Sequence, residues 1–309
     1  MTRAVVFAYH DVGVRCLRVL LAHGVEVALV LTHEDNPQEQ IWFDSVARHA
    51  HWHGLRVITP SDPNTPEIIA QVRAARADFL FSFYYRNMLG AEMLCCATRG
   101  AFNMHGSLLP QYRGRVPVNW AVLHGETETG ATLHEMTVKP DAGALVDAEA
   151  VPILPDDTAV EVFRKVTVAA EITLDRALPG LLAGTAVLKP QDLSQGGYFG
   201  RRTARDGAID WHLGMSAVHN LVRAVAPPFP GAFARAGGET LRVLRTLPVA
   251  GAGSAEPQLC WRDGAVLALC PDGVLKLLEF ELGGAVRDAA AFQARYGFKS
   301  LALSAGASE

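Results

Sequence analysis

The chain has 309 residues, half of them hydrophobic and 19% charged, a composition typical of globular proteins. The length suits one large domain or two medium ones, each with its own hydrophobic core. A formal net charge of −4 argues against a nucleic-acid-binding protein, because such proteins normally present a basic face.

The sequence shows neither a targeting signal nor a disulfide pattern, and we therefore predict a cytoplasmic protein. The first apolar run is too short for the core of a signal peptide and ends at Tyr9-His10-Asp11. No segment approaches the ~20 apolar residues that span a bilayer. The five cysteines have neither a CxxC pair nor the spacing of a disulfide framework, so we interpret them as reduced thiols.

Short apolar runs alternate with amphipathic stretches through the first hundred residues. This alternation predicts an α/β domain with a parallel, Rossmann-like sheet and right-handed crossovers. The predicted strands are 4–8, 26–31, 55–58, 78–83 and 101–105, and the predicted helices are 14–22, 44–53, 66–77 and 87–96.

The composition and the hydrophobic pattern change in the second half of the chain. Strands are predicted at 131–138 and 145–151, and a capping box at Thr158 and Glu161 opens a helix that runs to about Leu182. The 190s are rich in Gly and Gln and indicate a boundary. Beyond them a small β-barrel or sandwich is predicted from β-like runs at 240–244, 265–269 and 274–282, after a helix at 216–225. We therefore predict a catalytic domain over residues 1–190 and a second domain over residues 203–309.

Two polar residues interrupt the predicted strand at 101–105. Residues i and i+2 of a strand share a face, so Asn103 and His105 project together. Gly106 then ends the strand, which places both side chains at its carboxyl end. Ligands bind at the carboxyl ends of the strands in open α/β sheets, so we predict a functional site here.

Asn, His and a carboxylate together suit acyl transfer to an amine. Asn103 donates hydrogen bonds without titrating and can stabilise a developing oxyanion. His105 can give or take a proton near neutral pH, and Asp141 is the best-placed carboxylate to orient it and raise its pKa. No Ser or Cys nearby is placed as a nucleophile, which favours direct transfer over a covalent acyl-enzyme. A neutral core pair is the structural alternative for Asn103 and His105.

Two other motifs do not predict a binding site. The first turn, YHDVGV, lacks GxGxxG, so a dinucleotide is not expected. His49, His51 and His53 alternate along a predicted helix, where residues two apart point away from each other. We therefore predict no metal site, since helical metal ligands use spacings of three or four.

The stretch FNMHGSLLPQYRGRVPVNWA resembles the signature of enzymes that use N10-formyltetrahydrofolate. Its parts are Asn-x-His, Ser-Leu-Leu-Pro and Tyr-Arg-Gly, and Asp141-Ala142-Gly143 downstream matches the family's Asp-x-Gly. The family includes methionyl-tRNA, glycinamide ribonucleotide and sugar-nucleotide formyltransferases. The resemblance implies a catalytic trio of Asn103, His105 and Asp141, N10-formyltetrahydrofolate as co-substrate, and an OB-like C-terminal domain.

The resemblance also implies binding residues. Tyr84 and Tyr85 are candidates to line a sugar-nucleotide pocket, and a core position is the alternative for both. Arg201 and Arg202 can hold a pyrophosphate, because guanidinium pairs well with phosphate, and a solvated linker is the alternative for this pair. The implied folate contacts come from one arginine and from the residues up to and including Asp141: Arg115, Thr137, Val138, Lys139, Pro140 and Asp141.

Further stretches look closest to one branch of the family. These are FAYHDVG, THEDNP, FSFYYRNM, FGRRT and HNLVRAVAPPFPGAF, and the branch is the UDP-4-amino-4-deoxy-L-arabinose formyltransferases of lipid A (lipopolysaccharide) modification and polymyxin resistance. The likeness covers most of residues 1–235 and implies a free-standing formyltransferase. The alternatives are a dTDP-linked 4-aminohexose acceptor, methionyl-tRNA, hydrolysis of the formylated folate, or an inactive folate-binding module.

Charge argues against tRNA as the acceptor. The stretch HEDNPQEQ is acidic where methionyl-tRNA formyltransferases carry a basic loop, and ten Lys and Arg balance ten Asp and Glu over residues 203–309. A domain that holds tRNA phosphates should not be neutral. We therefore predict small-molecule partners, no nucleic acid and no membrane insertion.

Overall fold

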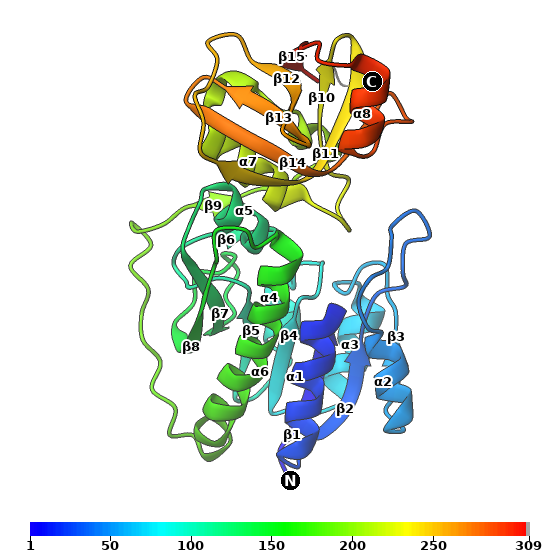
Figure 1. Ribbon diagram of the computed structural model, residues 1–309. Coiled ribbons are helices and arrows are strands. Elements are labelled where there is room, and N and C mark those ends of the chain that lie inside the picture. Colours follow the sequence, from blue (N-terminus) through cyan, green and yellow to red (C-terminus); the bar gives the residue numbers. More distant parts are fainter. Residues whose placement is uncertain (307–309) are drawn as a thin grey trace. The chain divides into compact units, whose positions relative to one another are not determined.

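The computed structural model describes residues 1–306 (Figure 1). By its contacts the chain forms two compact units. The first comprises Met1–Pro117, Glu128–Pro152 and Phe163–Gly200. The second comprises Val118–Thr127, Ile153–Val162 and the chain from Arg201 onward.

A seven-stranded sheet forms the centre of the first unit, in the order β3-β2-β1-β4-β5-β7-β8. The first five strands in this order are parallel, as predicted, whereas β7 runs antiparallel to β5 and β8 antiparallel to β7. This confirms the Rossmann-like fold class and adds two antiparallel strands at one edge. The strands are β1 (Arg3–Ala8), β2 (Glu26–Leu31), β3 (Val57–Ile58), β4 (Phe79–Phe83), β5 (Gly100–His105), β7 (Glu128–Glu135) and β8 (Leu145–Pro152).

Helices cover both faces of this sheet. Figure 1 shows α1 and the long helix α6 side by side, and Arg15 of α1 pairs with Glu171 of α6 at 3.1 Å. Ile69 and Val72 of α3 belong to a separate apolar cluster that includes β1 and β2 side chains. The helices are α1 (His10–Ala22), α2 (Val46–Trp52), α3 (Pro66–Ala74), α4 (Ala91–Leu94) and α6 (Ala159–Ala183), of which α6 belongs to the first unit from Phe163 onward.

Two predictions of local structure need revision, and one is confirmed. The helix predicted at 87–96 is only the four residues of α4, because the Asn64 side chain accepts from the Gly90 amide at 2.7 Å and donates to the Met88 carbonyl at 2.9 Å. Those bonds fix residues 88–90 as a loop. The strand predicted at 55–58 is shortened to β3. The capping box is present, since the Thr158 amide donates to the Glu161 carboxylate at 2.7 Å.

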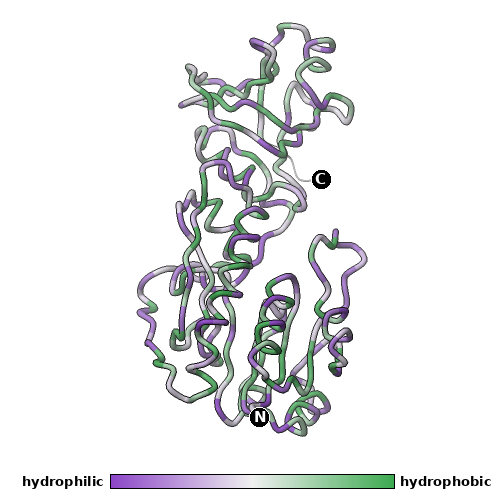
Figure 2. Tube along the Cα trace, turned by 60° about the horizontal axis from the view of Figure 1, so that its bottom comes forward, coloured by the Kyte–Doolittle hydropathy of each residue, from purple (hydrophilic) through white to green (hydrophobic). Residues whose placement is uncertain are grey.

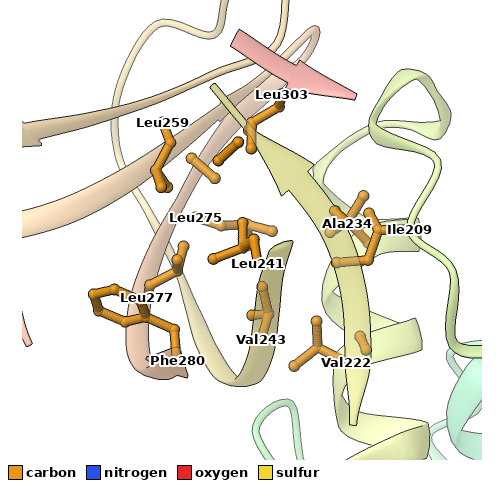
Figure 3. Packing of buried hydrophobic residues seen from close by; sticks show 14 of the residues in the cluster. Ile209, Val222, Ala234, Leu241, Val243, Leu259, Leu275, Leu277, Phe280 and Leu303 are labelled. Atoms are coloured by element: carbon orange, nitrogen blue, oxygen red, sulfur yellow. The ribbon is translucent and has the colours of Figure 1, made fainter. Parts of the chain in front are cut away.

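The second unit contains a closed six-stranded barrel in the order β10-β11-β14-β13-β12-β15, in which every neighbouring pair is antiparallel. This confirms a small β-rich domain. Figure 3 shows its core, where Leu241, Leu275 and Leu303 from different strands point toward one another. The strands are β10 (Ala232–Ala236), β11 (Glu239–Val249), β12 (Gln258–Arg262), β13 (Ala265–Cys270), β14 (Gly273–Leu282) and β15 (Leu301–Ala305).

Short helices accompany the barrel, and a two-stranded ribbon accompanies the sheet. Helix α7 buries Val218 and Val222 in the barrel core. The helical segments are α5 (Pro117–Leu123), η1 (Ala204–Gly207), η2 (Trp211–Leu213), α7 (Met215–Val225) and α8 (Ala289–Tyr296), and the ribbon pairs β6 (Arg113–Gly114) with β9 (Tyr198–Phe199). Among residues 1–306 no helix is long and apolar enough to cross a bilayer, and Figure 2 shows hydrophilic residues interrupting the chain throughout.

Candidate active site

The carboxyl end of β5 carries the two polar residues that the sequence singled out. Strand alternation buries Phe102 and Met104 on one side of β5, so Asn103 and His105 share the other. The antiparallel partner β7 places His134 directly opposite Asn103 and Thr132 opposite His105. The site is therefore built on two adjacent strands, which hold side chains more rigidly than loops do.

His134 joins this cluster and fixes the amide of Asn103. The Nδ1 atom of His134 lies 2.8 Å from the Glu135 carbonyl oxygen, which can only accept, so Nδ1 carries the hydrogen. Nε2 lies 3.1 Å from Nδ2 of Asn103 and, with the hydrogen on Nδ1, is the acceptor in that contact. This bond orients the amide, and its nitrogen retains a second hydrogen for another acceptor.

His105 is held between a backbone carbonyl and a carboxylate. Its Nε2 atom donates to the Tyr112 carbonyl oxygen at 2.9 Å, and its Nδ1 atom lies 3.6 Å from Oδ1 of Asp141. The same carboxylate oxygen lies 3.5 Å from Nε2 of His134. Because Nε2 is committed to the carbonyl, His105 exchanges its proton at Nδ1, on the side of Asp141.

Asp141 is the centre of charge in this cluster. Its backbone has a left-handed φ of 50°, and the Gly114 amide donates to its Oδ2 atom at 2.8 Å. Burial raises the pKa of the Asp141 carboxyl, but His105, His134 and the Gly114 amide outweigh it and hold that pKa well below the usual range. The carboxylate is therefore ionised near neutral pH.

The pKa of His105 departs from the sequence-based expectation. Asp141 and the Tyr112 carbonyl both raise it, as expected for a paired imidazole, but the side chain is only 7% exposed. Burial is the larger effect, so the pKa of His105 is lowered overall. The lowered pKa favours the neutral ring near pH 7.

A second layer from the 190s supports these residues. The side-chain amide of Gln191 donates to the carbonyl oxygens of Asp141 at 3.1 Å and Gly143 at 2.6 Å. In the ribbon, Arg113 pairs with Tyr198 and Gly114 with Phe199, which places the Gly114 amide under the carboxylate. The glycine-rich 190s therefore pack on the site instead of only linking two domains.

The residues implied to contact folate lie around this cluster in the first unit. Arg115 is exposed, and its amide donates to the Phe199 carbonyl at 2.9 Å. The loop before Asp141 is open to solvent, with Val138 67% exposed and the Thr137 hydroxyl donating to the Lys139 carbonyl at 2.9 Å. Pro140 is half-buried beside Asp141. The geometry is compatible with a ligand along this loop, and the folate contacts stay a prediction.

The two tyrosines proposed for the sugar pocket differ in their surroundings. Tyr85 is buried and stacks on His33 with ring centroids 4.2 Å apart, which is the core position that the sequence left open. Tyr84 has a left-handed φ of 58°, and its buried hydroxyl finds no hydrogen-bond partner among residues 1–306. A Cβ atom on Gly106 would overlap that hydroxyl, so Tyr84 lies directly against the backbone that follows His105.

Arg201 and Arg202 belong to the second unit. Arg201 is exposed, and the Arg202 guanidinium lies 4.7 Å from the ring centroid of Trp120 and donates to the Asp206 carbonyl at 2.9 Å. Their predicted contact with a pyrophosphate stays a prediction.

Sequence reasoning missed His134, Gln191 and the Tyr112 carbonyl. His134 is 2% exposed and contacts two members of the trio. The signal that identifies it is its place opposite Asn103, which needs the register of β7 on β5. Within residues 1–306 no three His, Cys, Asp or Glu side chains are grouped to hold a metal ion.

Together these groups supply the parts that acyl transfer needs. Asn103 offers an oriented amide hydrogen for a developing oxyanion, and His105 offers a nitrogen that can take up and release a proton. Asp141 supplies a fixed negative charge that stabilises the imidazolium when it forms.

Three solved structures have a similar fold. The N-formyltransferase from Helicobacter canadensis, in complex with folinic acid and dTDP-3-aminofucose, has 19% identity and a TM-score of 0.68, with 90% of this chain and 98% of that one covered. WlaRD, a sugar 3N-formyl transferase solved with dTDP and 5-N-formyl-THF, has 17% identity and a TM-score of 0.70, with 90% and 97% covered. A sugar N-formyltransferase from Shewanella sp. FDAARGOS_354 has 18% identity and a TM-score of 0.64, with 81% and 100% covered.

Family models match both parts of the chain. Formyl transferase matches residues 17–178, which include Asn103, His105 and Asp141, and formyl transferase, C-terminal domain, matches residues 202–297. The chain therefore belongs to the formyl transferase family and is a formyltransferase.

Proposed function

We propose that the enzyme transfers a formyl group from N10-formyltetrahydrofolate to the 4-amine of UDP-4-amino-4-deoxy-L-arabinose. The observation that carries this proposal is the cluster of Asn103, His105 and Asp141 at the carboxyl end of β5, whose orientation and charge suit acyl transfer to an amine. We assign the chemistry to residues 1–190 and place the enzyme in the cytoplasm.

The cluster fits a bound formyl donor. The donor supplies a formyl group on an amine nitrogen, whose carbonyl oxygen becomes negative as the acceptor amine adds. The second amide hydrogen of Asn103 and the open loop at Thr137–Lys139 are the features that accommodate such a ligand. We propose that Arg115 and residues 137–141 hold it.

Proton movement follows from the fixed tautomers. As the acceptor nitrogen bonds to the formyl carbon, Asn103 donates to the oxyanion. Net transfer moves one proton from the acceptor amine to the departing nitrogen, and no other species is needed for balance. His105 takes up that proton at Nδ1, Asp141 stabilises the resulting imidazolium at 3.6 Å, and His105 then gives the proton to the leaving group.

The acceptor is the finer part of the proposal. Stretches such as FAYHDVG and FSFYYRNM favour the UDP-linked aminopentose, and Tyr84 is the candidate sugar-nucleotide contact in the first unit. A dTDP-linked aminosugar is the second candidate, because two solved structures with this fold were determined with dTDP or a dTDP-aminosugar.

An acceptor assay tests both levels. Purified enzyme is mixed with N10-formyltetrahydrofolate and UDP-4-amino-4-deoxy-L-arabinose, and formylated product is followed by mass spectrometry. Parallel reactions contain a dTDP-4-aminohexose, charged initiator tRNA, or no acceptor. Product with the UDP sugar supports the full proposal, turnover only with the dTDP sugar changes the acceptor, and product only on tRNA or folate consumed without an acceptor contradicts a sugar substrate.

The catalytic trio is tested separately with N103A, H105A and D141A. Each is expected to lower kcat by about 10²- to 10³-fold, since each removes a positioned donor, proton carrier or charge. H51A, at an exposed histidine on α2, is the control and should keep full activity. Wild-type turnover in all three variants, with an unchanged circular dichroism spectrum, would contradict the mechanism.

A further inference from the structure

The outside of the barrel carries a hollow of about 370 Å³ in the second unit. It lies over β10, β11 and η1, and all of its lining comes from the second unit. None of the residues that we place at the candidate active site lines it. Its lining is unusually rich in arginine, with one residue from each of these three elements: Arg205, Arg235 and Arg242.

Strand register brings the lining residues onto one surface. Phe233 on β10 lies opposite Arg242 on β11, and Arg235 lies opposite Thr240. The intervening residue Ala234 is buried and faces the barrel core (Figure 3). Because side chains alternate along a strand, these four point outward together and form a rigid floor for the hollow.

The arginines carry charge that the protein does not neutralise. Arg235 donates to the Gly238 carbonyl at 2.8 Å, and Arg242 donates to the Pro230 carbonyl at 2.7 Å. Neither these two nor Arg205 forms an ion pair with a carboxylate within the part of the chain that the structure describes. Neutral carbonyls therefore hold two guanidinium groups in place while leaving their charge available to a ligand.

Three carboxylates on these or neighbouring elements have other partners. Asp206 receives the Thr203 hydroxyl at 3.0 Å in its cap. Glu239 accepts from Arg295 at 2.8 Å and from the Tyr296 hydroxyl at 2.7 Å. Glu281, opposite Arg242 on β14, lies 3.7 Å from Arg287. Within residues 1–306 these carboxylates are therefore not available to the three arginines, and an incoming anion can compensate their charge.

Phe233 adds a flat apolar surface beside this charge. It is half-buried, and the backbone of Gly207 and Gly306 packs against its ring, so that a Cβ atom on Gly306 would overlap it. Aromatic rings of this kind stack on nucleobases, and guanidinium groups pair with phosphate oxygens.

We propose that this hollow binds a nucleoside diphosphate, with its phosphates on Arg205, Arg235 and Arg242 and its base against Phe233. A volume of about 370 Å³ suits one small ligand. A nucleic-acid strand is disfavoured, because basic and acidic residues balance over residues 203–309.

The test compares UDP binding in two double variants of the full chain by equilibrium dialysis. R235S/R242S removes two charges from the hollow, and R262S/K299S removes two exposed charges elsewhere in the second unit. We expect R235S/R242S to bind one UDP per chain fewer than wild type, or to bind it at least about tenfold more weakly, while the control matches wild type.

The outcome is separable from the proposed function. If the catalytic site also binds UDP, wild type binds two and R235S/R242S one; if it does not, the counts are one and none. Equal binding in wild type and R235S/R242S overturns the site, as does an equal loss in both double variants, which would indicate a diffuse charge effect.

A third variant tests the stacking. F233L should weaken UDP binding about fivefold or more and leave inorganic pyrophosphate binding unchanged, because only UDP carries a base. Equal weakening of both probes contradicts the assignment of the base to Phe233.

Discussion

Asn103 can act only if its amide is held in one orientation, and that task falls to His134. The 3.1 Å bond to Nε2 of His134 depends on the hydrogen at Nδ1, which the Glu135 carbonyl fixes. His134 contacts no predicted substrate group and works through Asn103 and Asp141. It is therefore a positioning residue.

We expect H134A to lower kcat about 10- to 100-fold with little change in the folate KM, because it misplaces a donor without removing it. The combined N103A/H134A variant should be slower than N103A by clearly less than the factor that H134A costs in wild type, because the part of the effect that acts through Asn103 is already lost. A purely structural role for His134 would instead make the two effects multiply, and the melting temperature of each variant checks for unfolding.

His10 lies at the start of α1 with a left-handed φ of 68° and stacks on Phe43 with ring centroids 3.8 Å apart. Burial, with a smaller contribution from Arg86, lowers the pKa of His10 to about 3. Between about pH 6.5 and 3, His10 therefore carries a proton in the unfolded chain but not in the folded chain. The folded state is favoured fully above pH 6.5 and loses stability as the pH falls.

By this linkage, His10 lowers the free energy of unfolding by about 2 kcal/mol when the pH falls from 7 to 5. H10N, which tolerates the left-handed backbone, should shrink the loss of stability over that range by this amount. Urea unfolding at the two pH values measures it, with H51N at an exposed site as the control. An H10N slope equal to that of H51N would refute the buried neutral state.

At the scale of elements, the turn between β7 and β8 decides where Asp141 lies. Gly143 packs so tightly on the Glu135 carbonyl that a Cβ atom would overlap it, and its own carbonyl accepts from Gln191 at 2.6 Å. The Asp-x-Gly motif thus pairs a catalytic candidate with the residue that allows the turn to close.

G143A is expected to lower kcat at least about tenfold and to destabilise the fold by about 1–3 kcal/mol, because the turn must shift and carry Asp141 with it. G200A is the matched control, since its Cβ atom would meet nothing within 4 Å and its φ is not in the left-handed region. Activity and thermal denaturation are measured for both. Wild-type turnover in G143A would show that the turn tolerates displacement.

Local pattern predicted most elements of the sheet and the pairing of Asn103 with His105 on one face. These features depend on alternation and on residues close in sequence, which a single chain reveals. His134 and Gln191 could not be found in this way, because their roles depend on strand register and on a loop that returns from about fifty residues away. The same limit explains why α4 was predicted too long, since Asn64 truncates it from a distant loop.

For the molecule as a whole, composition and hydrophobic pattern predicted two parts, an α/β unit followed by a β-rich one. They did not reveal that the second unit also takes in Val118–Thr127 and Ile153–Val162 from the middle of the chain. Those segments look like ordinary connections in the sequence, and only their contacts in the folded chain assign them to the second unit. The predicted domains 1–190 and 203–309 are contiguous, whereas the compact units interleave.

This interleaving constrains how the gene can be cut. The Asn119 amide donates to the Ala224 carbonyl at 2.8 Å, His219 to the Pro155 carbonyl at 3.1 Å, and Arg223 to the Asp157 carbonyl at 2.9 Å. A fragment that starts at residue 203 lacks those inner partners, so that His219 keeps only its bond to Thr246 and Arg223 only its bond to Asn220. The barrel is therefore a poor candidate for a module that recombination can move alone, and the two units are expected to be inherited as one piece.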